Sequence, residues 1–511
     1  MTAEPEGRLA SIITPDATMD QALLQQRASS AATGFQALGL REGSTVAILM
    51  RNDIPFIEAS IAAQKIGAFA VPINWHSTAS EILYVLQDCR PDLLVVQADL
   101  LATPGLTLPE GLPVIAAATP PATARAFRLS EALCAVPPGV RDWEPFIAAH
   151  PPRTEPDARA RGAIIYTSGT TGHPKGVKRV PMDAELLGRN IRCFVDTYGL
   201  APDVRTLLVT PLYHASPGGF ARYAATQGEL LVLMPRFDPE EFLALIEKHR
   251  INTITAVPTM FIKLLKLPAA VRARYDLSSL RWVSHTAAAC PVDVKKAMID
   301  WWGPILHEVY GGTEVGIAMH CTSEEWLAHP GTVGRVLNGA EVRILGEDGR
   351  VLPQGETGEI YVRNPNYADF TYINQPAARI ETEKDGFISI GDVGWLDEDG
   401  FLFLGDRKRD MIIFGGTNIY PAEIESALVQ HPQVADCAVI GLPDPEFGEI
   451  VGAWIQPAKG SAPTEAEIAG FLGQTLARYK LPRRYVFVDS LPREESGKLM
   501  KRKLREATVP G

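Results

Sequence analysis

The stretch TASEILYVLQDCRPDLLVV, residues 78 to 96, joins a helix signal directly to a strand signal. Thr78 and Glu81 have the spacing of a capping box, in which each side chain accepts a hydrogen bond from the other residue's backbone N–H at the start of a helix. The apolar run DLLVV follows Arg90 and Pro91 and has the length of a buried strand. The stretch therefore predicts a helix over residues 79 to 89 that leads into a strand of a covered sheet.

The same order returns at DPEEFLALIEKHRINTITAV, residues 238 to 257. Asp238 is suited to cap a helix, Pro239 to occupy its first position and Glu241 to lie in its first turn. The run INTITAV then predicts the next strand. Strands that alternate with helices in this way are typical of an α/β architecture with a largely parallel sheet.

The pattern changes near residue 340. The runs EVRILGEDGRVL, GEIYVR and GFLFLGD are rich in strand formers and separated by turn residues, which predicts a smaller and more antiparallel module. The charged stretch GDRKRD, residues 405 to 410, then precedes a self-contained α+β pattern. We expect an N-terminal domain over residues 1–405, a hinge at 406–410 and a smaller α+β C-terminal domain over 411–511. The Pro/Ala-rich residues 104 to 124 are expected to be an irregular surface segment.

Composition restricts the class of protein. The 511 residues include 46% apolar and 21% charged residues, an ordinary globular composition, and the net charge of −11 argues against nucleic acid as a partner. The N-terminus lacks the positive charges of a signal peptide, and no apolar run reaches the roughly 18 residues of a membrane span, so we expect a cytoplasmic protein. Six cysteines without a CxxC pair indicate reduced thiols and neither a disulfide framework nor a zinc site.

The loop YTSGTTGHPKG, residues 166 to 176, follows the predicted strand GAIIY. Its glycines let backbone N–H groups approach phosphate oxygens, its hydroxyl residues add donors, and Lys175 adds a positive charge. It is not a Walker A loop, because its spacing differs and neither Ser nor Thr follows the lysine. The loop predicts a polyphosphate site formed by Thr167, Ser168, Gly169, Thr170, Thr171, Gly172 and Lys175.

This loop resembles the signature phosphate-binding motif of the adenylate-forming superfamily, which includes acyl-CoA synthetases, firefly luciferase and peptide-synthetase adenylation domains. Further motifs follow in the order of that family: PLYHAS (211–216), YGGTE (310–314), IGDVGWLDEDGFL (390–402), GDRKRDMIIFGGTNIYPAEIE (405–425) and PREESGKLMKRKL (492–504). Together they cover the chain from about residue 40 to its end. The resemblance implies ATP, Mg²⁺ and coenzyme A as ligands and a C-terminal domain that is mobile.

Activation of a carboxylate by ATP brings two anions together, so the site must neutralise charge on the triphosphate and at the reacting phosphorus. The resemblance implies that Glu314 binds magnesium and that Thr313 lies near the phosphate. It implies further that Lys498, in the C-terminal tail, reaches the α-phosphate and the carboxylate during adenylation, a role that a mobile point charge can fill.

The nucleotide has a second set of expected contacts. Asp392 resembles the carboxylate that binds both ribose hydroxyls, and Arg407 resembles the arginine that joins it. Ile390 stands where the family usually has threonine, which removes one possible polar contact. The other nucleotide residues that the resemblance implies are Ala288, Tyr310, Gly311 and Gly312.

The C-terminal tail points to the thiol substrate. From Arg478 to Arg505, ten Lys or Arg residues stand against three acids, which fits the phosphorylated nucleotide of coenzyme A, although a solvated basic surface is an alternative. Gly415 and Gly416 would let a thin pantetheine arm pass the backbone. The resemblance places a hinge at Arg409, so that rotation presents Lys498 for adenylation and the glycine loop for thioester formation.

The acid site is less well defined by the sequence. The resemblance places His214, in PLYHAS, beside the carboxylate, and residues 218 to 225, 257 to 261 and 284 to 291 around the acid and adenine. The last segment reads SHTAAACP, whereas many relatives have SGAAPL, so that Ala289 replaces proline and His285 occupies the serine position. The small residues of these segments leave room for an apolar and bulky acid.

We therefore expect an ATP-dependent acyl-CoA ligase that forms an acyl-adenylate with release of pyrophosphate, and then an acyl-CoA with release of AMP. Its partners would be a small carboxylic acid and coenzyme A, in a monomer or a homodimer. Three alternatives stay open: acyl loading onto a carrier protein, the thioesterification half-reaction alone from a supplied acyl-adenylate, and a silent nucleotide- or acyl-binding module. The sequence leaves the acid and the pathway undetermined.

Overall fold

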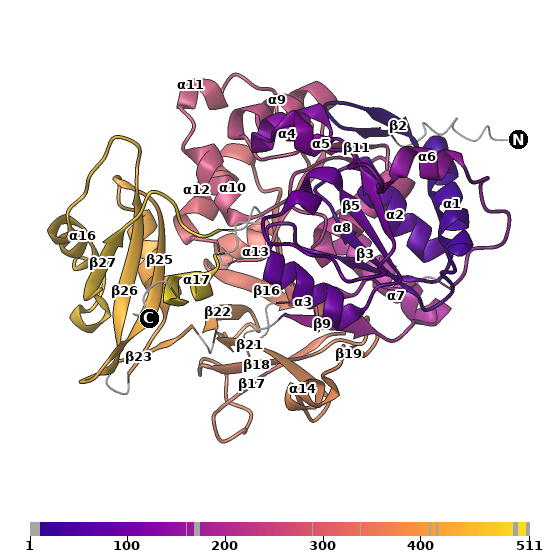
Figure 1. Cartoon of the computed structure of the whole chain (residues 1–511). Helices are drawn as coiled ribbons and strands as arrows, with labels where there is room; N and C mark the ends of the chain where they lie inside the picture. Colours follow the sequence, from indigo (N-terminus) through magenta and orange to yellow (C-terminus); the bar gives the residue numbers. More distant parts are fainter. Residues whose placement is uncertain are drawn as a thin grey trace, which may run out of the picture.

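The computed structural model describes residues 11–159, 161–167, 174–288, 290–337, 339–407, 410–414, 417–493 and 499–506. Within these ranges the strands form four sheets: one of 14 strands, two of five strands and one of three. Figure 1 shows helices packed around the sheets of the N-terminal part and a smaller unit, in yellow, to one side. The architecture is the expected α/β fold with a smaller C-terminal unit.

The first five-stranded sheet is parallel and has the order β4-β3-β5-β6-β7. Its strands are β3 (Thr45–Leu49), β4 (Phe69–Pro72), β5 (Leu93–Gln97), β6 (Val114–Ala117) and β7 (Arg141–Asp142). The helices of this region are α1 (Gln21–Ala37), α2 (Ile54–Lys65), α3 (Ala79–Cys89), α4 (Pro121–Phe127), α5 (Glu131–Cys134) and α6 (Trp143–Ala148), with the 3-10 helix η1 (Ala98–Ala102). The predicted helix and strand of residues 78 to 96 are confirmed as α3 and β5, and Thr78 and Glu81 form both arms of the capping box.

The second unit is the 14-stranded sheet. Its first strands are β1 (Ser11–Ile13), β2 (Thr18–Asp20), β10 (Arg205–Leu208), β11 (Leu230–Leu233), β12 (Thr253–Ala256), β13 (Trp282–His285), β14 (Leu306–Gly312), β15 (Gly316–Cys321) and β16 (Thr332–Val336). Its helices are α7 (Ala184–Thr197), α8 (Ala215–Gln227), α9 (Pro239–His249), α10 (Pro258–Leu265), α11 (Ala269–Arg272), α12 (Val292–Trp302) and α13 (Ser323–Ala328). The strands from β11 through β14 pair in parallel, and Asp238 caps α9 as predicted.

The main core lies between these two sheets. Helices α1, α2 and α8 form a layer whose buried residues include Phe35, Ile57 and Phe220. Because each sheet has helices on both faces, several of its strands are buried over their whole length, as β4, β5, β11 and β12 are.

The β-rich segment after residue 340 does not form a sheet of its own. Its strands are β17 (Glu341–Leu345), β18 (Gly358–Arg363), β20 (Glu383–Lys384), β21 (Phe387–Leu396) and β22 (Leu402–Arg407). They are antiparallel as expected, but β22 also pairs with β16, so the segment continues the 14-stranded sheet. The nucleotide motifs of β14 and β21 therefore belong to one hydrogen-bonded sheet.

One local expectation is wrong. The segment from 104 to 124 is not irregular throughout, because it contains buried strand β6 and the start of α4. The phosphate loop follows a strand, as predicted, and it joins the antiparallel strands β8 (Ile165–Thr167) and β9 (Lys175–Arg179). These strands form a small sheet with β19 (Phe370–Tyr372), which is followed by α14 (Pro376–Glu381).

The C-terminal unit contains the remaining elements. They are β23 (Ile412–Phe414), β24 (Thr417–Ile419), α15 (Pro421–Val429), β25 (Val434–Asp444), β26 (Gly448–Pro457), α16 (Glu465–Leu472), β27 (Arg484–Phe487) and α17 (Lys501–Glu506), with the 3-10 helix η2 (Arg478–Lys480). Figure 1 shows the unit beside β22 and α12, with α17 on the side that faces the N-terminal part. Lys266 Nζ donates to the Ala435 carbonyl at 2.6 Å between the two parts. The domain limits at 405 and 411 stay a prediction.

Among the residues with described positions, none of the helices combines the length and the apolar character of a membrane span.

Candidate active site

Glu314 lies in the turn between β14 and β15, where three distant segments of the chain meet. Its Oε1 accepts hydrogen bonds from Thr167 Oγ1 at 3.0 Å and from the Tyr372 hydroxyl at 3.2 Å. Thr167 ends the strand before the phosphate loop, and Tyr372 ends β19. Burial and the neighbouring carboxylate of Glu314 raise the pKa of Tyr372, so this hydroxyl remains a donor. The expected metal ligand is therefore held against the entry of the expected phosphate loop.

Two glycines make this turn possible. A Cβ atom at Gly311 would lie 2.0 Å from the Gly316 carbonyl oxygen, which no side chain could tolerate. A Cβ atom at Gly312 would lie 2.8 Å from Ile390 Cδ1. Ile390 thus packs directly over Gly312, which gives a physical role to the residue that departs from the family pattern.

Arg179, at the end of β9, was not identified from the sequence. Its Nη2 donates to the carbonyl oxygens of Thr313, at 2.6 Å, and of Glu314, at 2.9 Å, and its Nη1 donates to the Ala368 carbonyl. Its guanidinium also lies 5.1 Å from the centre of the Tyr367 ring. Burial lowers the pKa of Arg179, but the carbonyl dipoles and nearby acids favour its charged form. Arg179 therefore fixes the backbone of the turn that carries the two expected catalytic residues.

Lys175 begins β9 on the other side of the phosphate loop. It is 8% exposed, and its Nζ lies 5.1 Å from the centre of the Tyr372 ring. Tyr372 thus contacts both the expected phosphate-binding lysine and the expected metal ligand. Ser168, Gly169, Thr170, Thr171 and Gly172 lie outside the described residues.

Asp392 and Tyr310 form the second polar contact of the site. The Tyr310 hydroxyl donates to Asp392 Oδ2 at 2.9 Å, which joins the YGGTE strand to the IGD strand. Asp392 is also the cross-strand neighbour of Arg407, whose backbone position is described and whose side chain is not. The three residues expected at the adenosine therefore lie on adjoining parts of one sheet.

Helix α8 begins at the motif PLYHAS. His214 is its N-cap, with extended backbone, and the exposed Ala215 follows it. Gly218 lies one turn further, and a Cβ there would be 2.8 Å from the Leu212 carbonyl, so the glycine allows the helix to pack against the preceding strand end. His214 is thereby placed at the edge of the α8 layer that separates the two large sheets.

The residues of the segment 284 to 291 differ in their exposure to solvent. Ala287 and Ala288 are exposed, and Ala287 has φ of 76°, a strained value for a residue other than glycine. His285 is instead fully buried, with its ring 5.5 Å from that of Phe261, so it does not line the acid or adenine site as expected. Its position at the end of β13 points it into the core, whereas the loop after it faces outward. Ala289 lies outside the described residues.

The basic tail is partly paired. Four of its side chains form salt bridges with acids elsewhere in the C-terminal unit: Lys480 with Glu423, Arg493 with Asp436, Lys501 with Glu425 and Arg505 with Asp410. These salt bridges neutralise part of the positive charge that the ten Lys and Arg residues of the tail carry. Lys498, Gly415, Gly416 and Arg409 lie outside the described residues, so their expected roles stay predictions.

The site was tested for its fit to magnesium. Glu314 uses only Oε1 for its two hydrogen bonds, and within the described chain Oε2 has no hydrogen-bond partner. The described residues contain no cluster of three or more metal-ligating side chains. Mg²⁺ suits such a site, because it commonly takes one or two carboxylates and completes its shell with substrate phosphates and water.

Comparisons with known proteins give a consistent result. The family model of AMP-binding enzymes matches residues 4–369, and that of the AMP-binding enzyme C-terminal domain matches residues 423–498. The chain is 33% identical to a long-chain-fatty-acid–CoA ligase of Mycobacterium tuberculosis, over 98% of this chain and 97% of the relative. It is 34% identical to a feruloyl-CoA synthase of Amycolatopsis sp, over 94% and 92% of the two chains.

The fold matches solved structures over nearly its whole length. The structure of the amide bond synthetase McbA from Marinactinospora thermotolerans superimposes with a TM-score of 0.81 at 28% identity, and covers 98% of this chain and 97% of that one. The two family-model matches, together with the grouped Glu314, Thr167, Tyr310 and Asp392, lead to one assignment. The chain belongs to the AMP-binding enzyme family, in the acyl-CoA synthetase branch of the adenylate-forming superfamily.

Proposed function

We propose that this enzyme is an acid–CoA ligase that forms an acyl-adenylate from a carboxylic acid and ATP and then transfers the acyl group to coenzyme A. The observation that carries the proposal is the position of Glu314, whose carboxylate is held by Thr167 and Tyr372 beside the phosphate loop. With Asp392 and Tyr310 on the same sheet, one surface offers groups for the triphosphate and for the ribose.

In the first step an oxygen of the acid attacks the α-phosphorus of ATP, and the bond to pyrophosphate breaks. Lys175 would contribute positive charge at the phosphates, and Lys498 is proposed to reach the α-phosphate and the carboxylate. Glu314, through Oε2, would hold Mg²⁺, which when bound neutralises phosphate charge. Arg179 keeps Thr313 and Glu314 in place but does not contact the reacting atoms. In the second step the thiol sulfur attacks the acyl carbon and AMP leaves.

The proposed acid is apolar with a polar group at its far end. Arg222 lies one helical turn beyond Gly218 on α8 and lines a hollow with Phe56 and Ser60 of α2. Arg222 is exposed to solvent, and burial of part of its side chain lowers the pKa of the guanidinium. Its guanidinium has no partner within the described chain. An acid with a second hydrogen-bond acceptor far from the reacting carboxylate would supply that partner.

The acid preference can be tested with matched pairs. Fatty or aromatic acids would be compared with analogues of equal length that carry a distal carbonyl or carboxylate. We expect kcat/KM to favour the analogues by about tenfold, and Arg222→Met to abolish that preference while activity with the plain acids is retained. Arg192→Met on α7 is the control, because this exposed arginine lies outside the hollow. An unchanged preference in Arg222→Met would rule out this role.

Coenzyme A is proposed to bind where the C-terminal helix approaches the N-terminal part. Burial lowers the pKa of His76 to about 4, and the charges of Arg51, Lys503 and Arg236 contribute to that shift. Lys503 belongs to α17, whereas His76 precedes α3, so positive charge from both parts of the chain acts at one place. Phosphate groups of a nucleotide would be attracted there.

The main test measures the two half-reactions separately. Pyrophosphate release and acyl-CoA formation would be followed with a panel of acids, for the wild type, Glu314→Gln and Lys498→Ala. We expect both variants to lose at least about 100-fold in pyrophosphate release, because each removes charge stabilisation at the phosphates. If the wild type releases no pyrophosphate with any acid, the proposal fails. Thioester formed only from a supplied acyl-adenylate would indicate that the chain performs the second half-reaction alone.

The acyl acceptor needs its own experiment, because a structure of similar fold is an amide bond synthetase. Coenzyme A, a phosphopantetheinylated carrier protein and simple amines would compete for one preformed acyl-adenylate. We expect the thioester of coenzyme A as the main product. If an amide or a carrier-bound thioester is the main product, the acceptor is an amine or the carrier protein and not coenzyme A. If ATP is not turned over at all, the result favours a binding module.

A further inference from the structure

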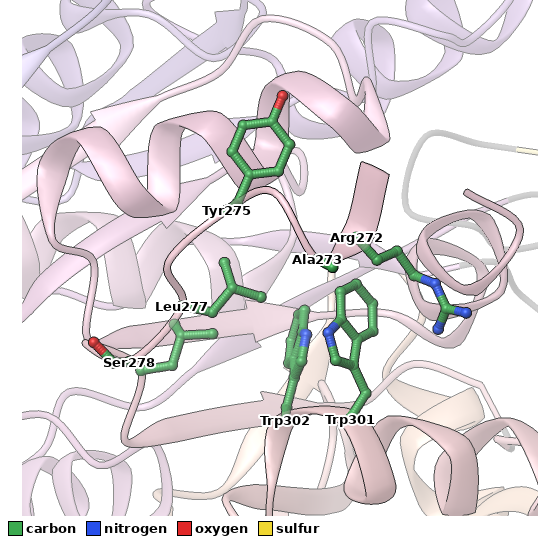
Figure 2. A pocket seen from close by; sticks show the side chains of 8 residues that line it. Arg272, Ala273, Tyr275, Leu277, Ser278, Trp301 and Trp302 are labelled. Atoms are coloured by element: carbon green, nitrogen blue, oxygen red, sulfur yellow. The ribbon is translucent and has the colours of Figure 1, made fainter. Parts of the chain in front are cut away.

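A pocket of about 330 Å³ opens at the C-terminal end of α12, away from the site described above. Figure 2 shows the pocket where the chain between α11 and β13 crosses the side chains of Trp301 and Trp302. Its eight lining residues are Arg272, Ala273, Tyr275, Leu277, Ser278, Leu280, Trp301 and Trp302. Ala288 precedes the other end of α12, which is about 15 Å away along a helix of this length.

The pocket walls are mainly aromatic and aliphatic. The Arg272 guanidinium lies 5.2 Å from the centre of the Trp301 ring, a cation–π contact that holds the charge at the pocket. The two indole rings have centroids 5.5 Å apart and an angle of 54° between their planes. A flat apolar group could therefore contact ring faces on one side and the leucine side chains on the other.

Two polar groups of the pocket are donors that lack acceptors. Arg272 Nε and Trp302 Nε1 are buried, and neither has a hydrogen-bond partner among the residues that the structure describes. Both atoms carry N–H groups and can only donate. Tyr275 already donates to Glu240 Oε1 at 3.1 Å, and no acidic side chain lines the pocket. A buried donor without a partner costs about 1–3 kcal/mol, so an acceptor or anion that enters would recover this free energy.

We propose that this pocket binds a small planar aromatic anion, such as an aromatic carboxylate. The ring system would lie against Trp301, Trp302 and the leucines, and the carboxylate would accept from Arg272 and from the Trp302 N–H. The site does not depend on the proposed ligase reaction, because none of its lining residues belongs to the acid, nucleotide or magnesium contacts.

The test uses 2-naphthoate and its uncharged analogue 2-naphthamide, with binding followed by isothermal titration and by tryptophan fluorescence. Glu314→Gln would serve as background, so that any use of the probe as a substrate is suppressed. We expect 2-naphthoate to bind and Arg272→Met to weaken it by about tenfold or more, with little effect on 2-naphthamide. Trp302→Phe keeps an aromatic wall but removes the N–H, and we expect a smaller loss of 2-naphthoate affinity.

Lys296→Met is the control, because this exposed lysine of α12 pairs with Asp300 and does not line the pocket. Thermal unfolding of each variant would verify that it is folded. Equal affinity for 2-naphthoate in the wild type, Arg272→Met and Trp302→Phe would overturn the proposal, because the probe would then bind elsewhere. No binding to the wild type at millimolar probe would overturn it as well.

Discussion

At the scale of single residues, the geometry of the phosphate turn depends on an arginine that donates to main-chain atoms. Arg179 reaches three carbonyl oxygens, two of them on Thr313 and Glu314. Hydrogen bonds from a charged donor contribute about 1.5–3 kcal/mol each, so the turn is held more firmly than its glycines alone would allow. Glu314 can then present Oε2 in a fixed direction.

We expect Arg179→Met to lower the rate of pyrophosphate release by about 10- to 100-fold, because a small displacement of the turn misplaces Glu314. Arg179→Lys should recover part of the rate. Stopped-flow measurement of pyrophosphate under saturating ATP would give the effect, with Arg189→Met as control, since Arg189 pairs with exposed Glu185 on α7. A full rate in Arg179→Met would show that the turn holds its geometry without this residue.

The sequence identified the residues that stand in motifs, and it missed those that act through space. Glu314, Tyr310 and Asp392 were found because their spacing matches a known pattern, and the structure brings each of them to the site. Arg179 and Tyr372 stand in no motif, because their contacts with Glu314 arise only when β9 and β19 pair beside β14. His285 was wrongly expected at the acid or adenine site, because the sequence at a strand end does not show in which direction a side chain points.

At the scale of elements, α12 is tied to β14 by a buried ion pair. Lys295 Nζ lies 2.6 Å from Glu308 Oε2, and both side chains are almost fully excluded from solvent. Burial raises the pKa of Glu308, while the nearby lysine opposes that rise. His285 of β13 lies 3.6 Å from the same oxygen, so three elements of the nucleotide region meet at one carboxylate. The Lys295–Glu308 ion pair therefore holds β14 in place at Glu308, two residues before Tyr310.

We expect Lys295→Met to lower the free energy of unfolding by about 3–5 kcal/mol, because it leaves a carboxylate buried without its partner. The double variant Lys295→Met/Glu308→Leu should regain most of that loss. Urea denaturation of the wild type, both single variants and the double variant would give the coupling energy. Additive losses in the double variant would mean that the two side chains act independently.

The histidines on β14 and β15 make the fold sensitive to acid. His307 stacks on Trp282 with centroids 3.5 Å apart, and its Nδ1 lies 3.1 Å from His320 Nε2. Burial, and then the neighbouring His320, lower the pKa of His307 to about 3. The folded state therefore binds fewer protons than the unfolded state between pH 6.5 and 3. The stabilisation is fully present above pH 6.5 and is lost as pH falls through this window.

We expect the free energy of unfolding to fall below pH 6.5, with His307 contributing about 1.4 kcal/mol per pH unit. His307→Gln should reduce that slope by the contribution of about one proton. Denaturation curves at several pH values between 7.5 and 5 would measure it. The same slope in wild type and His307→Gln would exclude His307 as the source.

Elements were predicted well where a local signal exists. The caps of α3 and α9 depend on residues within one turn, and both helices begin where predicted. Strand β6 was missed because its four residues follow a proline-rich stretch, and its burial comes from pairing with β5. The strand before the phosphate loop was predicted, but its antiparallel pairing with β9 was not, since sequence alone does not show which strand is the partner.

At the scale of the whole molecule, the position of the C-terminal unit decides which of its side chains face the N-terminal part. Lys503 of α17 acts electrostatically on His76, while Lys266 reaches the backbone at Ala435. These contacts join residues more than 150 positions apart. No pattern in the sequence could have predicted them.

We expect Lys503→Ala to raise the KM for coenzyme A several-fold and to leave pyrophosphate release unchanged, because its charge lies at the proposed site of the second substrate. The effect should weaken at high salt, because ions screen the attraction between Lys503 and the phosphates of coenzyme A. Steady-state kinetics at two ionic strengths would test this, with Lys459→Ala, on the loop after β26, as control. A loss of pyrophosphate release in Lys503→Ala would instead place this lysine in the first half-reaction.

The pairing of β16 with β22 has a consequence for dividing the gene. A fragment that ends at Arg407 would keep each strand of the 14-stranded sheet, so the sheet would have the same edge strands as in the full chain. A fragment that stops after Val336 would leave β16 as a new edge with unpaired backbone groups, and such edges promote aggregation. Chimaeras between related enzymes should therefore be joined after residue 407, not near residue 340, where the sequence pattern changes to β-rich runs.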